Sequence, residues 1–97
     1  MLTSKQRSFL RALGHKLEPI VFLGKGGLTD NIIKELDTNL DLRELIKVKL
    51  QDGCELEIKD VANEVGETLK ADVVQVIGHK FILYRESQEN KEITLPR

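Results

Sequence analysis

The 97-residue sequence contains one cysteine, Cys54, two prolines and no tryptophan. A single cysteine excludes an intrachain disulfide framework and a metal site built from several cysteines. The longest apolar runs, Pro19–Leu23 and Phe81–Tyr84, fall far short of the ~20 residues that a membrane-spanning helix needs. The first residues also lack the apolar stretch of a secretory signal. We therefore expect a cytoplasmic protein with no membrane association.

Sequence signatures of catalysis are missing as well. No His-x-x-x-His, Cys-x-x-Cys or Gly-x-Ser-x-Gly motif is present. Cys54 has acidic neighbours, Asp52 and Glu55, which disfavour a reactive thiolate. The histidines, His15 and His79, fall on a predicted exposed helix stripe and in a predicted turn. We predict a protein that is not an enzyme, with no cofactor, no bound metal and no small-molecule substrate.

The composition is that of one globular domain, and its charges are unevenly distributed. Hydrophobic residues make up 40% and charged residues 32% of the chain. Residues 1–34 carry six basic and two acidic side chains, whereas residues 35–97 carry nine and fourteen. This asymmetry can form a local anion-binding face although the net charge is only −1. The same pattern also arises when charges simply solvate helix faces, so charge alone leaves both interpretations open.

The first helix is predicted to begin at a capping box formed by Thr3 and Gln6. Its inner face is predicted from apolar residues that recur at helical spacing, namely Phe9, Leu10, Leu13 and Leu17. A basic stripe, expected to face solvent, lies opposite and contains Arg7, Arg11 and His15. Gly14 and Pro19 are expected to break the helix or to bracket its end.

The rest of the sequence predicts alternating strands and helices. Ile20–Leu23 is a continuous apolar run, typical of a central strand or one covered on both faces. Thr29 is the predicted N-cap of the second helix, which is followed by a strand at Leu45–Leu50 with Lys47 and Lys49 on one face. A third helix is predicted from Ile58, Val61, Ala62, Val65 and Leu69, and a hairpin from Val73–Ile77 and Lys80–Arg85.

These elements give the order α-β-α-β-α-β-β, which predicts an α+β fold with helices packed on a mixed sheet. Residues 1–85 are expected to form the domain. The polar segment Glu86–Arg97 is expected to be a loosely held tail.

Three glycines lie between the first predicted strand and the second helix, in Gly24-Lys25-Gly26-Gly27. One glycine would be enough for a tight corner, and each further one costs backbone entropy. Backbone N–H groups, a helix N-terminus and Lys25 could together bind a phosphate. The nucleotide and dinucleotide signatures are absent. The remaining Gly-x-x-Gly pattern is the one by which KH modules clamp a nucleic-acid backbone. Together with the basic stripe on the first helix, this pattern favours nucleic-acid binding over the alternative that the glycines serve only the geometry of the turn.

Few aromatic residues are available to stack on bases. Phe9 and Phe22 occupy predicted core positions, and Phe81 and Tyr84 alternate on the last strand. Recognition is therefore expected to depend on phosphates and RNA shape. The candidate RNA-binding residues are Arg7, Arg11, His15, Lys16, Gly24, Lys25, Gly26, Gly27, Lys47 and Lys49. Among them, Lys47 and Lys49 are expected on the open face of the sheet, too far from the loop to share its RNA strand. The alternative function is a protein–protein adaptor whose basic face docks an acidic partner.

Six sequence blocks, in order, resemble the CRM domain and its free-standing bacterial, YhbY-like members. They are LTSKQR (2–7), LRAL (10–13), IVFLGKGGLTD (20–30), ELIKV (44–48), QVIG (75–78) and LYR (83–85). The resemblance spans residues 2–85. It implies a mixed four-stranded sheet similar to that in the C-terminal domain of bacterial translation initiation factor three.

The resemblance also implies a function. Members of this family are RNA-binding modules associated with precursors of the large ribosomal subunit, and Gly24–Gly27 matches their Gly-x-x-Gly RNA loop. The basic first helix matches their basic face. Members often end the third helix with Thr-Gly, where this sequence has Leu69-Lys70, so the resemblance leaves the end of that helix undefined.

Overall fold

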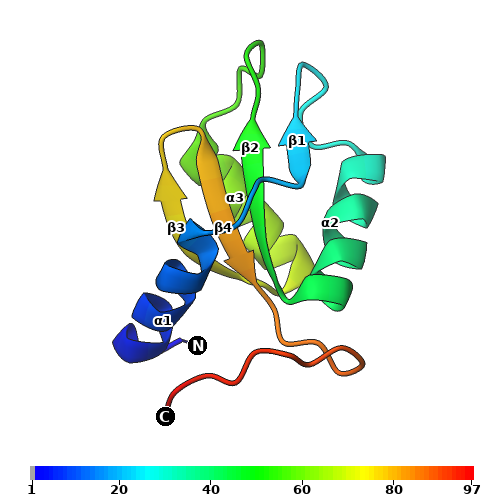
Figure 1. Cartoon of the computed structure of the whole chain (residues 1–97). Helices are drawn as coiled ribbons and strands as arrows, with labels where there is room; N and C mark the ends of the chain where they lie inside the picture. The colour runs from blue at the N-terminus through cyan, green and yellow to red at the C-terminus, as the bar shows by residue number, and fades with distance from the viewer. Residues whose placement is uncertain (1) are drawn as a thin grey trace.

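Helices and strands alternate along the chain and end in a hairpin, as the sequence predicted (Figure 1). The computed structural model describes residues 2–97. The helices are α1 (Ser4–His15), α2 (Asp30–Arg43) and α3 (Ile58–Leu69). The strands are β1 (Val21–Leu23), β2 (Leu45–Leu50), β3 (Asp72–Ile77) and β4 (Lys80–Tyr84). None of these helices is long and apolar enough to cross a membrane.

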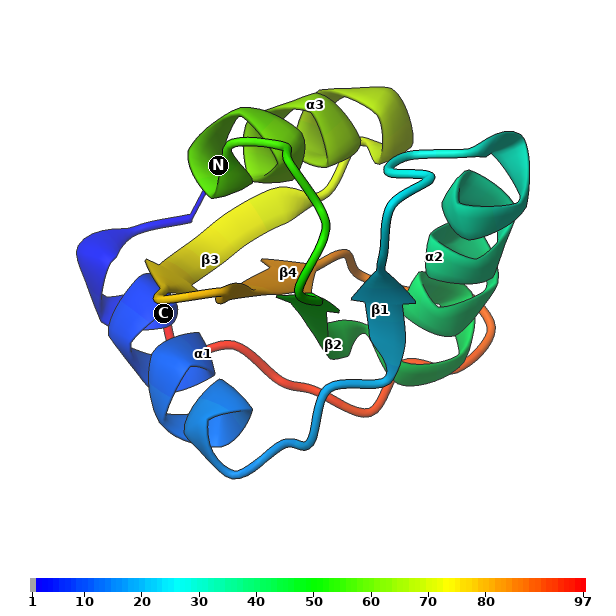
Figure 2. The ribbon, with the colours of Figure 1, turned by 90° about the horizontal axis from the view of Figure 1, so that it is seen from above.

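The four strands form one mixed sheet in the order β1-β2-β4-β3. β1 runs parallel to β2, whereas β4 is antiparallel to both β2 and β3. α1 covers one face of the sheet, and α2 and α3 cover the other, as the view from above shows (Figure 2). The predicted α+β fold with a mixed four-stranded sheet is confirmed.

Each face of the sheet has its own hydrophobic cluster. The larger cluster lies under α2 and α3 and includes Val21, Leu23, Val48, Phe81 and Leu83. The smaller one lies under α1 and comprises Leu10, Leu45, Val74, Ile82 and Tyr84. Strand alternation places Phe81 and Tyr84 on opposite faces, as expected.

The prediction that the first strand is central or covered on both faces is wrong. β1 is an edge strand of three residues, and its buried side chains, Val21 and Leu23, point to the α2–α3 side. Phe22 points to the opposite side and is 44% exposed. A continuous apolar run therefore does not require burial on both faces here. Phe22, the middle residue of the strand, faces the part of the sheet that α1 leaves uncovered.

The buried face of α1 also differs from the prediction. The capping box of Thr3 and Gln6 is present, but Leu10 and Gly14 are the buried residues. Phe9, Leu13 and Leu17 stay more than a third exposed. Gly14 lies within the helix, where a Cβ atom would come 2.7 Å from Cδ1 of Ile82. The missing side chain therefore allows α1 to approach the sheet closely, and the helix ends at His15, between Gly14 and Pro19, as predicted.

The C-terminal segment has no regular secondary structure, but it makes more contacts than its expected looseness implies. Glu44, fully buried at the end of α2, accepts hydrogen bonds from the backbone N–H groups of Ser87, Glu92 and Ile93 at 2.8, 2.7 and 2.9 Å. Burial alone would raise the pKa of Glu44, but these three donors outweigh it and hold the pKa below 4.5. Ile93 and Leu95 pack against the cluster under α1.

The end of α3, which the resemblance left undefined, is also resolved. Lys70 caps the helix in the left-handed conformation, with φ 55° and ψ 44°, and its N–H donates to the carbonyl of Gly66. Glycine adopts this conformation at little cost, whereas a residue with a Cβ atom is strained there. The helix therefore ends where a glycine would fit best, although the sequence has a lysine.

Candidate nucleic-acid interface

The segment Gly24–Gly27, here called the GKGG loop, is a tight turn at the carboxyl end of β1. The N–H of Gly27 donates to the carbonyl of Gly24 at 3.0 Å. Two residues later, Thr29 caps α2 and accepts a hydrogen bond from the N–H of Ile32, as predicted. Asp30 in the first turn partly offsets the positive end of the helix dipole. Any anion at this position would therefore depend mainly on the loop amides and Lys25.

The fold requires glycine at only one of the three glycine positions in the loop. Gly27 has φ +64°, and a Cβ atom there would come 2.9 Å from Leu56. At Gly24 and Gly26 the nearest atoms would lie 3.6 Å away, which is ordinary contact, and neither residue has positive φ. Chain geometry therefore accounts for Gly27 and leaves Gly24 and Gly26 without a structural reason.

Lys25 is positioned by the neighbouring loop between β2 and α3. Its aliphatic stem passes Gly53, where a Cβ atom would come 3.3 Å from two of its carbons. The two loops are tied together by the N–H of Gln51, which donates to the carbonyl of Leu23 at 2.8 Å. They lie side by side at the top of the sheet in Figure 1. The side chain of Lys25 is thus held against the loop between β2 and α3.

The side of the GKGG loop that faces α3 is acidic. A hollow there is bordered by Lys25, Gly26 and Gly27 and, across from them, by the carboxylates Glu55, Glu57, Asp60 and Glu64. These charges repel phosphate. An anionic ligand would therefore reach the loop from the opposite side, where β1 and β2 present the sheet face that also carries α1.

The basic stripe of α1 divides into two parts. Arg7 was expected to face solvent, but it turns towards the sheet, and its guanidinium donates hydrogen bonds to the carbonyls of Val73 and Val74. Val74 is the extra residue of a bulge in β3, so Arg7 satisfies backbone groups that the ladder leaves out. Arg11 is exposed, and its guanidinium donates a hydrogen bond to Ser8. His15 and Lys16, at the end of the helix, are also exposed.

Lysines on β2 and β4 extend this basic surface across the sheet. Lys47 and Lys49 lie on the same face, as predicted, because Val48 and Leu50 point to the other side. Lys47 is 9% exposed beneath α1, whereas Lys49 is exposed. Lys49 lies opposite Phe22, and Phe22 precedes Gly24 by two residues. Lys49 is therefore about 7 Å along the strand direction from the start of the loop, much closer than expected.

Two exposed residues that flank Lys49 on this face were missed by the sequence interpretation. Lys80 pairs with Lys49, and Phe22, which had been assigned to the core, lies on the other side of Lys49. Strand alternation could have found Lys80, since it immediately precedes the buried Phe81. The assignment of Phe22 to the core is therefore wrong.

The cations of this surface are not neutralised by the chain itself. Within residues 2–97, the ion pairs join Arg85 to Asp37 and Asp41, and Lys91 to Glu86. All of them lie away from the GKGG loop. A hollow at the end of α1 is lined by His15, Lys47, Gln75, Ile77, Lys80 and Ile82, and none of these is acidic. The surface from His15 to Lys25 is therefore suited to an anion.

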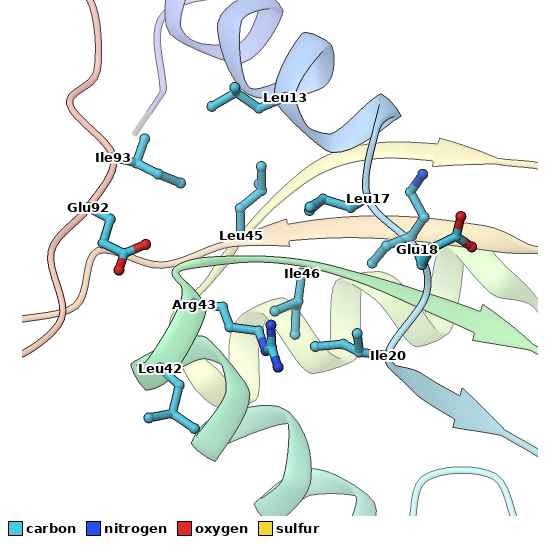
Figure 3. A pocket seen from close by; sticks show the side chains of 11 residues that line it. Leu13, Leu17, Glu18, Ile20, Leu42, Arg43, Leu45, Ile46, Glu92 and Ile93 are labelled. Carbon is cyan, nitrogen blue, oxygen red and sulfur yellow. The ribbon is translucent and has the colours of Figure 1, made fainter.

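A second hollow on the α1 side has a different character (Figure 3). Leu13 of α1 and Leu17, which follows the helix, face Leu45 and Ile46 of β2 across it, and Leu42 and Ile93 also line it. Its lining is mainly aliphatic, and of the expected RNA-binding residues only Lys47 reaches it. This hollow explains how Leu13 and Leu17 remain partly exposed, and it lies apart from the loop.

Comparison with known proteins identifies the family. The model of the CRS1 / YhbY (CRM) domain matches residues 2–85. The chain belongs to the CRM domain family. It is 48% identical over 96 residues to "Probable RNA-binding protein YqeI" of Bacillus subtilis, covering 99% of this chain and all of that protein. It is 45% identical to an "RNA-binding protein" of Haemophilus influenzae, covering 99% of this chain and 96% of the other.

A solved structure supports the same assignment. The solution structure of SAV1595 from Staphylococcus aureus superposes with a TM-score of 0.83 at 47% identity, over 99% of this chain and 100% of that one. The family resemblance expected from the six sequence blocks is thus confirmed, together with the fold that it implied.

Proposed function

We propose that this CRM protein binds RNA by contacting the phosphates of the RNA backbone and that it catalyses no reaction. We further propose that the RNA is ribosomal RNA in precursors of the large ribosomal subunit. The observation that carries the proposal is the pair of glycines, Gly24 and Gly26, that the fold does not require. They leave the backbone on both sides of Lys25 without side chains, so a phosphate can approach the loop amides there.

The charges around the loop support one direction of approach. Carboxylates on the α3 side repel a phosphate, whereas Lys49, Lys80 and His15 lie on the sheet face across the loop. An RNA strand that follows this face would place one phosphate at the GKGG loop and others beside the lysines. Arg11 would extend the contact along α1, while Arg7 holds the β3 bulge.

The names of the relatives support RNA as the ligand, since two of them are named as RNA-binding proteins. The ribosomal part of the proposal comes from the resemblance to YhbY-like proteins. A module that binds mainly phosphates gains selectivity from folded RNA, and ribosomal RNA is the most abundant folded RNA in a bacterial cytoplasm. We infer that the protein acts in the cytoplasm by holding an rRNA segment during assembly.

Crosslinking in cells, followed by sequencing of the bound RNA, tests this function. The proposal predicts reads concentrated in large-subunit rRNA and its precursors, and cosedimentation with immature large subunits on a gradient. Reads spread over all transcripts would overturn the ribosomal part and leave RNA binding. Purified protein that carries no RNA, absorbs little at 260 nm and binds an acidic protein instead would support the adaptor and overturn RNA binding.

A further inference from the structure

One row of side chains crosses all four strands on the α1 side of the sheet, beside the GKGG loop. The strand register places Phe22 opposite Lys49, Lys49 opposite Lys80, and Lys80 opposite Ile77. We call these four residues the open row. All four are exposed, with Phe22 at 44% and Ile77 at 46%. α1 packs on β2, β3 and β4 and leaves this end of the sheet uncovered.

From the open row we infer that Phe22 is a stacking surface for an unpaired RNA base, adjacent to the phosphate held by the GKGG loop. This inference rests on the proposed function and adds a base to the phosphate contacts. It identifies the ligand at this position as a single-stranded, looped or bulged nucleotide, because bases within a duplex already stack on each other.

The geometry of β1 supports this placement. Phe22 precedes Gly24 by two residues, so its ring is about 7 Å along the strand from the start of the loop. One nucleotide can therefore place its phosphate at the loop and its base at the ring. The side chains of Val21 and Leu23 are fully buried on the other face and fix the orientation of Phe22.

Positive charge beside Phe22 is complementary to the phosphates of a nucleic acid. Lys49 and Lys80 occupy the centre of the open row, and His15 and Lys47 lie in the next hollow towards α1, which no carboxylate lines. A strand whose base stacks on Phe22 would have its following phosphates beside these cations. Lysines alone attract any RNA, so the aromatic ring is the element that distinguishes unpaired from paired nucleotides.

Short RNAs containing 2-aminopurine, a fluorescent adenine analogue quenched by stacking, test the inference. The probes are a single strand with the analogue at each position in turn, and the same strands annealed to their complements. Phe22→Leu removes the ring but keeps an apolar side chain, and Phe22→Tyr keeps the ring. Phe9→Leu is the matched control, because Phe9 is 37% exposed on α1, outside the open row.

We expect the wild type and Phe22→Tyr to change the analogue's fluorescence at one position. Phe22→Leu should lose that change and weaken single-strand binding by roughly tenfold, the scale of one stacked base, while duplex affinity stays the same. Phe9→Leu should behave like the wild type. Unchanged single-strand affinity in folded Phe22→Leu, or equal losses for both probes, would overturn the stacking site and leave phosphate binding intact. If the wild type binds neither probe, the proposed function itself fails.

Discussion

Arg7 and Arg11 lie one turn apart on α1, and the structure predicts that their replacement by alanine affects two different properties, stability and RNA binding. Arg7 donates to the carbonyls of Val73 and Val74 at the β3 bulge and is partly buried. Arg11 is exposed, and its guanidinium donates a hydrogen bond to Ser8 on the same helix. We expect Arg7→Ala to affect mainly the free energy of unfolding, and Arg11→Ala to affect mainly the salt dependence of RNA binding.

The magnitudes follow from the contacts. A hydrogen bond to a charged group contributes about 1.5–3 kcal/mol, and Arg7→Ala also leaves the bulge carbonyls without their donor. Because the site is only partly buried, we expect a total loss of about 2 kcal/mol, which lowers Tm by roughly 10 °C in a chain of this size. Arg11→Ala should change the stability by less than about 0.5 kcal/mol. It should flatten the slope of log affinity against log salt by about one unit, the value for one lost phosphate contact.

Urea denaturation followed by circular dichroism gives the first quantity, and filter binding to an rRNA fragment over a series of salt concentrations gives the second. The sequence alone suggested that both arginines bind phosphates, so that the slope would flatten by about two units when both are replaced. A one-unit change in slope for Arg7→Ala without loss of stability would refute the role assigned to Arg7. An unchanged slope for Arg11→Ala would make the outer stripe of α1 ordinary solvated surface.

Two further predictions concern stability. Glu44→Gln should lose about 2–3 kcal/mol at pH 7 in urea denaturation, because three backbone donors lose their charged acceptor, whereas the exposed Glu92→Gln should stay within about 0.5 kcal/mol. The pKa of Glu44 is lowered in the folded state, so its ionised carboxylate stabilises the fold fully above pH 4.5, and this contribution to the free energy of unfolding declines as the pH falls through the folded-state pKa. The difference in stability between the wild type and Glu44→Gln should therefore shrink at that pH. A difference that does not depend on pH would contradict this. Lys70→Gly should raise the free energy of unfolding by about 1 kcal/mol, since Lys70 has φ 55°, and a lower Tm for this variant would contradict the strain assigned to the cap.

The sequence predicted the element order, both threonine caps and the alternation of β2 because these depend on local patterns. Thr3 and Thr29 cap their helices through contacts three residues away. Lys47 and Lys49 share a face because side chains alternate along a strand. The position and glycine content of the GKGG loop were also readable in the sequence, although its acidic neighbours on α3 were not.

The errors arose where tertiary contacts decide. α1 has apolar residues on two faces, and the buried one contains Gly14, which carries no hydrophobic signal but allows close contact with Ile82. The apolar run of β1 could not show that Phe22 lies on an uncovered part of an edge strand. The anchoring of the C-terminal segment by Glu44 joins residues more than 40 positions apart and has no local signature.

The affinity of Lys25→Glu for an rRNA fragment, compared with Lys59→Glu, tests the central claim most directly. Both variants make the same charge reversal on an exposed lysine, but Lys59 lies on α3, on the other side of the sheet. We predict that Lys25→Glu keeps the wild-type circular dichroism spectrum, binds at least about tenfold more weakly and has a flatter salt slope, while Lys59→Glu binds within about twofold of the wild type. Equal affinities for the two variants would show that the GKGG loop does not bind the RNA.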